Sequence, residues 1–459
     1  MGKVKSNFDF DKIIKEDWIN VLPNDLNQYV KTTLEGINIE PLYDQSSQPL
    51  LNTISISKTI DIQEYEISND PISNIVKKLF NCAEDNAGGV HFFEELNQLQ
   101  SVNHSTFSSA AFHEIGANHI QEISYLLATI SELLHQVKNN NGDIRQLLHT
   151  VQFELCVDTD FYMSIAKIKA FQLLIPIVLK EFIENIDYQK IIYITKTSKR
   201  TLTNEEETLN LIRKTIETIT AFLSGVDFVR IVPYEENEEA IRWTNNIYNL
   251  LKFESGLSNY RTLLNGSYYL EELTKQVAEK AWNQFLEIEE KGGFVNFVDS
   301  GEFFKDINRT NKNRLKQFML GDKKIVGNNA FRRVEPSTKY SQDDKTYIFR
   351  DSEWIEKCHL LLSTSWDCII LDGANEEDQK INEDIFKTLS SIGLKNQTNA
   401  DVIFLAGSQE SMKQFINQNK DKTVIQIGIN DGSEIPYSLL HITDLPDVIE
   451  KIHCEKGWN

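Results

Sequence analysis

The chain has 459 residues, 41% hydrophobic and 25% charged, which is the composition of a globular protein with two to three domains, or one barrel plus a smaller unit. Its formal net charge of −21 argues against a nucleic-acid partner, because binding to phosphate backbones requires clustered Lys and Arg. Five scattered cysteines without CxxC spacing, and no signal-type apolar run near Met1, predict a reduced, cytoplasmic protein.

Residues 1–44 precede the first predicted strand and are expected to form an N-terminal arm. A helix bearing Trp18 is followed by a Thr-x-x-Gly-Ile segment and then by Pro-Leu-Tyr, at positions 33–37 and 41–43.

Residues 45–331 alternate apolar, β-rich runs with helical runs, which is the pattern of parallel βα units. Eight strands are predicted, the number in a (β/α)8 TIM-type barrel: 53–62, 88–96, 105–113, 151–158, 190–198, 227–235, 257–264 and 323–328. Only about ten residues separate the second and third strands, too few for a crossover helix. The barrel is therefore expected to be trimmed on one side.

Long helices are predicted between these strands, at 70–85, 118–137, 161–184, 204–223, 238–253 and 270–290. The most apolar stretch, 165–182, carries Lys167, Lys169 and Lys180, which argues against a membrane span. Helix 204–223 repeats Leu and Ile at helical spacing, and this face is expected to pack on the sheet; the residues are Leu209, Ile212, Ile216, Ile219 and Leu223.

The hydrophilic stretch 332–351 lacks a sustained apolar period and is predicted to be a linker. Strands at 366–373, 400–408 and 423–430 then alternate with helices ending near 392, 419 and 452. Residues 352–459 are thus expected to form a small flavodoxin-like αβα unit. Its glycines stand singly at turns, with no GxGxxG or Walker pattern.

The stretch 242–293 carries the most specific pattern of the chain. A helix with Arg-x-x-x-Asn and Glu-Ser leads through a short predicted strand to a Gly-Ser-Tyr-Tyr turn and a long helix ending in Gly-Gly. This order resembles the methylmalonyl-CoA mutase family. The matching positions are Arg242, Asn246, Glu254, Ser255, Gly266, Ser267, Tyr268, Tyr269, Glu272, Leu273, Thr274, Ala281, Trp282, Glu289, Gly292 and Gly293. The arm is similar to the N-terminal arm of the family, which implies a role in subunit contact.

Residues 109–128 resemble the third-strand motif of the same family. The matching positions are Phe112, His113, Gly116, Ala117, Gln121 and Glu122. In catalytic subunits this His binds the thioester carbonyl, whereas the shorter pattern here resembles the small, non-catalytic subunit. His113 is therefore predicted either to line a residual pocket at the barrel mouth or to make a structural hydrogen bond.

Other parts of the family pattern are missing. Catalytic members carry a Tyr and several Arg residues between arm and first strand, where this chain has fewer than ten residues and no Arg. Cobalamin-binding members carry Asp-x-His-x-x-Gly, whose His ligates cobalt; His359, His441 and His453 lack Gly three residues later. The resemblance thus implies no catalytic residue, no cofactor-binding residue and no bound cofactor in this chain.

We therefore expect the small (beta) subunit of a heterodimeric methylmalonyl-CoA mutase, with adenosylcobalamin held by the large (alpha) partner subunit, or a homodimer if it is alone. Two alternatives stay open: the barrel half of an acyl-CoA mutase with a separate cobalamin-binding protein, and a stand-alone acyl-CoA-binding barrel. A triad of Ser109, His113 and Glu114 is discounted because neighbours on a strand face opposite sides. No metal site is predicted, because the His residues lack HExxH-type spacing.

Overall fold

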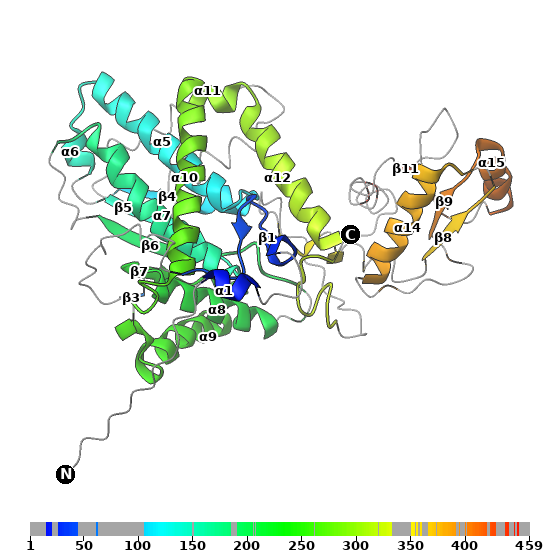
Figure 1. Cartoon of the computed structure of the whole chain (residues 1–459), viewed down its shortest axis with the longest axis horizontal. Coiled ribbons are helices and arrows are strands. Elements are labelled where there is room, and N and C mark those ends of the chain that lie inside the picture. The colour runs from blue at the N-terminus through cyan, green and yellow to red at the C-terminus, as the bar shows by residue number, and fades with distance from the viewer. Residues whose placement is uncertain are drawn as a thin grey trace, which may run out of the picture.

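A computed structural model gives the arrangement of the chain (Figure 1). It describes residues 15–20, 26–44, 61–62, 105–148, 151–184, 191–204, 206, 208–260, 262–319, 321–332, 350–353, 355–356, 359, 366–372, 374–391, 394, 400, 402–419, 423–427, 437–439, 445 and 448.

A five-stranded sheet lies at the centre of the main body, in the order β3-β7-β6-β5-β4. All pairs in it are parallel, as the βα pattern predicts. The strands are β3 (Asp61–Ile62), β4 (Ser105–Ser108), β5 (Val151–Val157), β6 (Ile192–Thr197) and β7 (Phe228–Arg230). β5 is buried along nearly its whole length, which is typical of a parallel strand covered on both faces.

Two of the eight predicted strands are wrong. Residues 257–264 begin with the 3-10 helix η4 (Leu257–Tyr260) and continue as turns. Residues 323–328 form a loop with one isolated bridge, between Val326 and Ala330. β3 pairs directly with β7, so in the described sheet neither segment lies between them. The strand predicted at 88–96 lies outside the described residues, and closure into a barrel stays a prediction.

Helices flank the sheet on the outside of the main body. They are α4 (Ala110–Glu114), α5 (His119–Asn139), α6 (Ile144–Leu147), α7 (Phe161–Lys180), α8 (Thr208–Leu223), α9 (Glu238–Asn249), the π-helical η3 (Leu250–Glu254), α10 (Tyr268–Glu290), α11 (Phe294–Asp299) and α12 (Glu302–Met319). α10 packs along both α5 and α7 (Figure 1). The predicted Gly-Ser turn before α10 is confirmed, since Gly266 has φ +84° and the Ser267 hydroxyl caps the helix.

Aromatic rings fill the core beneath α5, α11 and α12. Phe112 makes edge contacts with Tyr125 and Phe294 at centroid distances of 5.6 and 5.7 Å, and Tyr125 lies 5.2 Å from Phe303. The Tyr125 hydroxyl donates to Asp306 at 2.6 Å, so its polar end is satisfied within this apolar cluster.

α5 begins with a reciprocal capping box. The Asn118 side chain accepts from the backbone N–H of Gln121 at 2.9 Å, and the Gln121 side chain accepts from the Asn118 N–H at 3.0 Å. We expect Asn118→Ala to lower the free energy of unfolding by about 1 kcal/mol, because the first turn of α5 loses an acceptor. Urea denaturation followed by circular dichroism measures this, and an unchanged midpoint would contradict it.

Among the described helices, α7 alone is long and apolar enough, by length and composition, to cross a membrane. Within the molecule, 72% of its most apolar window is buried, and Lys167 is fully buried in it. Such burial is what a central core helix shows.

The prediction for the inner face of α8 is confirmed only in part, since Leu223 belongs to the main core cluster and Ile219 packs against it, but the stripe as a whole does not face inward. Ile212 and Ile216 are 58% and 38% exposed, although they belong to the apolar stripe expected to face the sheet. The buried residues of α8 include polar and charged ones: Asn210, Lys214, Glu217, Thr218 and Thr220. α8 therefore buries a polar face and turns two isoleucines outward.

The N-terminal arm packs on the main body of its own chain. It contains α1 (Lys15–Asn20), the 3-10 helix η1 (Leu26–Tyr29) and the antiparallel pair β1 (Lys31–Thr32) and β2 (Asn38–Ile39). Ile37 is 1% exposed and belongs to the main core cluster, and the ring of Tyr43 lies 5.2 Å from that of Tyr269. Its predicted role in subunit contact stays a prediction.

The C-terminal part contains a four-stranded parallel sheet in the order β11-β10-β9-β8. Its elements are β8 (Trp366–Ile370), α14 (Glu376–Ser391), β9 (Val402–Ala406), α15 (Gln409–Gln418), β10 (Thr423–Ile427) and β11 (Tyr437–Leu439). Alternate residues of β9 pack on opposite sides: Phe404 with a cluster that includes Ile385 of α14, and Leu405 with a cluster that includes Met412 of α15. The three predicted strands of this part are confirmed. The predicted linker and final helix lie largely outside the described residues, and the domain boundaries stay predictions.

Candidate functional site: a buried polar network

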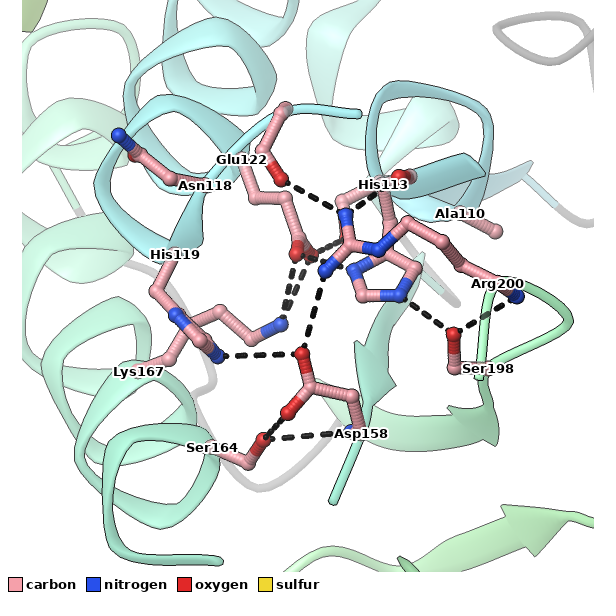
Figure 2. A network of polar contacts seen from close by, with 12 residues as sticks. Ala110, His113, Asn118, His119, Glu122, Asp158, Ser164, Lys167, Ser198 and Arg200 are labelled. Carbon is pink, nitrogen blue, oxygen red and sulfur yellow. Dashed lines mark hydrogen bonds and ion pairs between the residues drawn. The ribbon is translucent and has the colours of Figure 1, made fainter. Parts of the chain in front are cut away.

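Charged side chains converge at the carboxyl ends of β4, β5 and β6. His113 lies on α4 directly after β4, Asp158 follows β5, and Ser198 and Arg200 follow β6. Figure 2 shows these groups with their partners on α5 and α7. In parallel α/β folds this edge of the sheet is where ligands and reacting groups bind. It is therefore the candidate functional site.

His113 is completely buried, with a partner on each ring nitrogen (Figure 2). Nδ1 lies 2.6 Å from Glu122 Oε1 and Nε2 lies 2.7 Å from the Ser198 hydroxyl. Burial, together with the positive charge of Arg200, lowers the pKa of His113 to about 4. At neutral pH the ring is uncharged, so it donates from Nδ1 to Glu122 and accepts from Ser198 at Nε2. These contacts agree with the structural hydrogen bond, one of the two roles predicted for His113. The other role, lining a pocket at the barrel mouth, stays a prediction.

Glu122 of α5 is the acceptor at the centre of the network. Both of its carboxylate oxygens lie 2.9 Å from Lys167 Nζ, and Oε2 also accepts from the Ser109 hydroxyl at 3.1 Å. Burial alone would raise the pKa of Glu122, but Lys167 and His113 lower it to about 2. The result is a buried ion pair between α5 and α7.

His119 joins the arm to the main body. Its Nδ1 lies 2.8 Å from Glu35 of the arm, and Nε2 lies 3.5 Å from Asp158. Burial would lower the pKa of His119, but the carboxylates of Asp158 and Glu35 raise it to about 10. The protonated imidazole therefore bridges two buried acids at neutral pH.

Arg200 closes the network toward the C-terminal part. One of its terminal nitrogens donates to the backbone carbonyls of His113 and Ala117 at 2.9 and 3.1 Å, and the other lies 3.3 Å from Asp158. Asp351, the last residue of the predicted linker, lies 3.4 Å from Arg200 Nε, and its N–H donates to the Arg200 carbonyl at 3.1 Å. This edge is thus covered by side chains from three distant parts of the sequence.

Ser198, His113 and Glu122 have the hydrogen-bond order of a Ser-His-Glu triad. An attacking hydroxyl must reach a substrate carbonyl, whereas all three residues are at most 1% exposed and the Ser198 oxygen also accepts from the Arg200 N–H at 3.0 Å. The triad discounted from the sequence does not form, because Ser109 bonds Glu122 and Glu114 lies 3.5 Å from Lys196. The arrangement found is a buried network of hydrogen bonds and ion pairs.

Sequence reasoning missed most members of this network. The sequence does not predict Lys167, Asp158, Ser198 or Arg200 as site residues, although Asp158 and Ser198 end predicted strands and Arg200 lies two residues after one. That position was the available signal, because the carboxyl ends of parallel strands meet at one edge.

Among the described residues, those at the strand ends of the C-terminal sheet do not offer a ligand for the cobalt of cobalamin. The described carboxyl ends of β8 and β9 carry Leu371, Asp372, Gly407 and Ser408, with no imidazole among them. A Cβ at Gly407 would lie 2.8 Å from the Leu371 side chain, so this edge is filled by packing. Within the described ranges, no group of three or more His, Cys, Asp or Glu side chains is arranged to hold a metal ion.

Comparison with known proteins gives one consistent family. The family model described as methylmalonyl-CoA mutase matches residues 69–356. A 2-hydroxyisobutanoyl-CoA mutase large subunit from Aquincola tertiaricarbonis is 24% identical over 248 residues, 52% of this chain and 44% of that protein. A methylmalonyl-CoA mutase small subunit from Porphyromonas gingivalis is 28% identical over 225 residues, 48% of this chain and 36% of that protein. A methylmalonyl-CoA mutase from Cereibacter sphaeroides is 27% identical over 262 residues, 56% of this chain and 37% of that protein.

The chain therefore spans less than half the length of these relatives. The family model nevertheless covers more than half of the chain, including α4, α5 and the strands that carry the buried network. The chain belongs to the methylmalonyl-CoA mutase family.

Proposed function

We propose that this chain is a non-catalytic supporting subunit of a heterodimeric, adenosylcobalamin-dependent methylmalonyl-CoA mutase. The observation that carries the proposal is the state of His113, which is fully buried and bonded on both ring nitrogens to groups of the same chain. A histidine that polarises a substrate carbonyl needs one nitrogen directed at that substrate. Here neither nitrogen is available for that task.

The remaining network supports the same proposal. Lys167, Glu122, Asp158 and Arg200 make mutual ion pairs or hydrogen bonds where catalytic barrels place reacting groups. Several relatives are named methylmalonyl-CoA mutase small subunit, among them one from Propionibacterium freudenreichii that is 25% identical. The large subunit would carry the cobalamin and isomerise methylmalonyl-CoA and succinyl-CoA.

Co-expression with a cobalamin-dependent large subunit tests the proposal. Size-exclusion chromatography with light scattering should give a one-to-one complex, and that peak alone should contain cobalamin and mutase activity. Activity of this chain by itself with added cobalamin would contradict the proposal and favour an acyl-CoA mutase half. Tight binding of CoA esters by the isolated chain, without a complex, would instead favour a stand-alone binding barrel.

A variant of His113, assayed in the complex, distinguishes a structural role of this residue from a catalytic one. His113→Asn should leave turnover per assembled complex within about twofold of the wild type, because a structural hydrogen bond does not enter the rate of the chemical step. A catalytic histidine would cost roughly 100-fold or more. Turnover is normalised to the complex isolated by chromatography, so that lower stability of the variant does not count as lost activity.

A further inference from the structure

The surface formed by α8, α9 and the adjoining η3 presents an unusual number of apolar side chains to solvent. Ile212 and Ile216 of α8 point outward because the opposite face of this helix is occupied by Lys214 and Glu217. Across from them, Trp243 is 44% exposed, Leu250 49% and Phe253 72%. Large apolar side chains exposed on neighbouring helices such as α8 and α9 are a feature of binding surfaces.

A groove of about 540 Å³ is lined by seven residues of α9 and η3 and by one residue of α8. Its lining is largely apolar and consists of Leu211, Trp243, Asn246, Ile247, Asn249, Leu250, Phe253 and Glu254. We name these eight residues, with Ile212 and Ile216, the α8–α9 face. A groove bordered by two helices is suited to receive the apolar stripe of a third helix.

The end of α9 is a π-helical turn rather than an α-helical one. In η3 (Leu250–Glu254) the Ser255 N–H donates to the Leu250 carbonyl at 2.9 Å, five residues back. Such turns are rare and are frequently found at functional sites. This turn carries three groove residues, Leu250, Phe253 and Glu254. The irregular geometry is thus located where the most exposed aromatic ring of the face lies.

The charges around the groove indicate the chemistry of its occupant. Glu238, Glu239 and Glu254 are exposed at the two ends of the face. Two cations of α9 and η3 lie against aromatic rings of the face: Arg242 is 5.4 Å from the centroid of Trp243, and Lys252 is 5.5 Å from that of Phe253. The three exposed acids outnumber these two cations, which are already engaged with rings, so the surroundings of the groove are complementary to Lys or Arg. A second copy of this chain would bring the same acids and a net charge of −21, which disfavours self-pairing here.

We propose that the α8–α9 face binds an amphipathic helix of the large mutase subunit. Its apolar stripe would fill the groove, and Lys or Arg near each end would pair with Glu239 and Glu254. These two acids are separated by a helical length of roughly 20 Å, about four turns of a partner helix. This inference rests on the proposed function, because it names where the partner of that heterodimer docks.

The test uses the full chain with the co-expressed large subunit and measures the dissociation constant of the complex. Phe253→Asp should weaken binding at least about 100-fold, because it places a charge in the apolar groove. Glu254→Lys should weaken binding about tenfold and reduce the salt sensitivity of association. Leu286→Asp is the matched control, since Leu286 is an apolar residue of α10 with 41% exposure; it should leave the dissociation constant unchanged. Circular dichroism verifies that each variant is folded.

The outcomes distinguish the two proposals. Weakening confined to Phe253→Asp and Glu254→Lys supports the docking surface. A wild-type complex that neither variant weakens overturns the docking surface and leaves the supporting-subunit proposal standing. Failure of the wild-type chain to form any complex overturns both. Self-association that Phe253→Asp abolishes, with partner binding unchanged, assigns the face to a second copy and overturns this inference.

Discussion

Replacing Glu122 by Gln should lower the free energy of unfolding by about 3–5 kcal/mol. Lys167 is completely buried, and both of its short contacts to carboxylate oxygens, at 2.9 Å, are with Glu122. The neutral amide cannot compensate that charge, and it also changes the acceptor that fixes the His113 ring. Urea denaturation at pH 7, followed by circular dichroism, measures the loss.

Two further variants determine whether the uncompensated charge of Lys167 causes the loss of stability in Glu122→Gln. The double variant Glu122→Gln with Lys167→Met should recover much of the loss, since it removes the uncompensated ammonium as well. Glu302→Gln removes the partner of Lys291 in an ion pair that is 44% to 49% exposed, and should leave stability unchanged. A loss of less than about 1 kcal/mol for Glu122→Gln would contradict the prediction, because that is the range of surface pairs.

The same variant carries a pH signature. The pKa of Glu122 lies at about 2 in the folded chain and at 4.5 ordinarily, so folding favours the ionised form. Its contribution is complete above pH 4.5 and is lost as the pH falls toward 2. The difference in stability between wild type and Glu122→Gln should therefore persist from pH 7 to 4.5 and shrink below that.

The sequence predicted best those elements whose burial and periodicity agree. β5 and β6 are apolar runs covered on both faces, and α5 and α10 have strong caps and long apolar stripes, so local and tertiary preferences coincide. The described structure places all four close to their predicted ranges.

The two wrong strands show where local hydrogen bonding prevailed over composition. After Gly256, at φ +63°, the Asn259 N–H donates to the Gly256 carbonyl and the Leu263 N–H to the Tyr260 carbonyl. At 323–328, the Asn329 side chain accepts from the Ile325 N–H at 2.6 Å and donates to the Lys323 carbonyl at 3.0 Å. Backbone groups satisfied in this way cannot also join a sheet ladder. Apolar content alone does not reveal these turns.

The orientation of α8 could not be predicted from its own residues. Its stripe of Leu and Ile favours the sheet, but Glu217 accepts from the Ser198 N–H at 3.2 Å and from the Thr201 hydroxyl at 2.5 Å, and Lys214 bonds the Ser198 carbonyl. These partners lie beyond β6 and satisfy charges that would otherwise be buried without compensation. The need to pair them sets the rotation of the helix, and Ile212 and Ile216 are exposed as a consequence.

The candidate site was predictable in position but not in composition. His113 could be identified because it follows a strand and matches a family motif, yet its partners lie 9 and 85 positions away in the sequence. Glu35 comes from the arm and Asp351 from the end of the predicted linker, where no local pattern indicates that they face the same network. Pairings of this kind are set by the tertiary fold alone.

The stability of the chain should fall as the pH rises from 6.5 to 10, because of His119. Its pKa is about 10 when folded and 6.5 ordinarily, so the protonated form is favoured by folding. For a raised pKa, the stabilisation is complete below 6.5 and is lost as the pH rises toward the folded value. With Asp158 and Glu35 both buried against the imidazole, the full effect is on the order of 5 kcal/mol.

His119→Gln isolates this effect. The Gln side chain can still donate a hydrogen bond to Glu35, but it has no titrating proton. The variant should therefore be less stable than the wild type at pH 6 and nearly as stable as the wild type at pH 10. Urea midpoints at pH 6, 8 and 10 measure this difference, and His135→Gln, at an exposed position of α5, controls for loss of a histidine. A difference between wild type and His119→Gln that stays constant from pH 6 to 10 would show that His119 is uncharged in the folded chain. The arm would then be joined to His119 by the hydrogen bond to Glu35 alone. If the difference narrows as expected, a buried imidazolium joins the arm to the main body, and mildly alkaline conditions should loosen the arm before the rest of the fold.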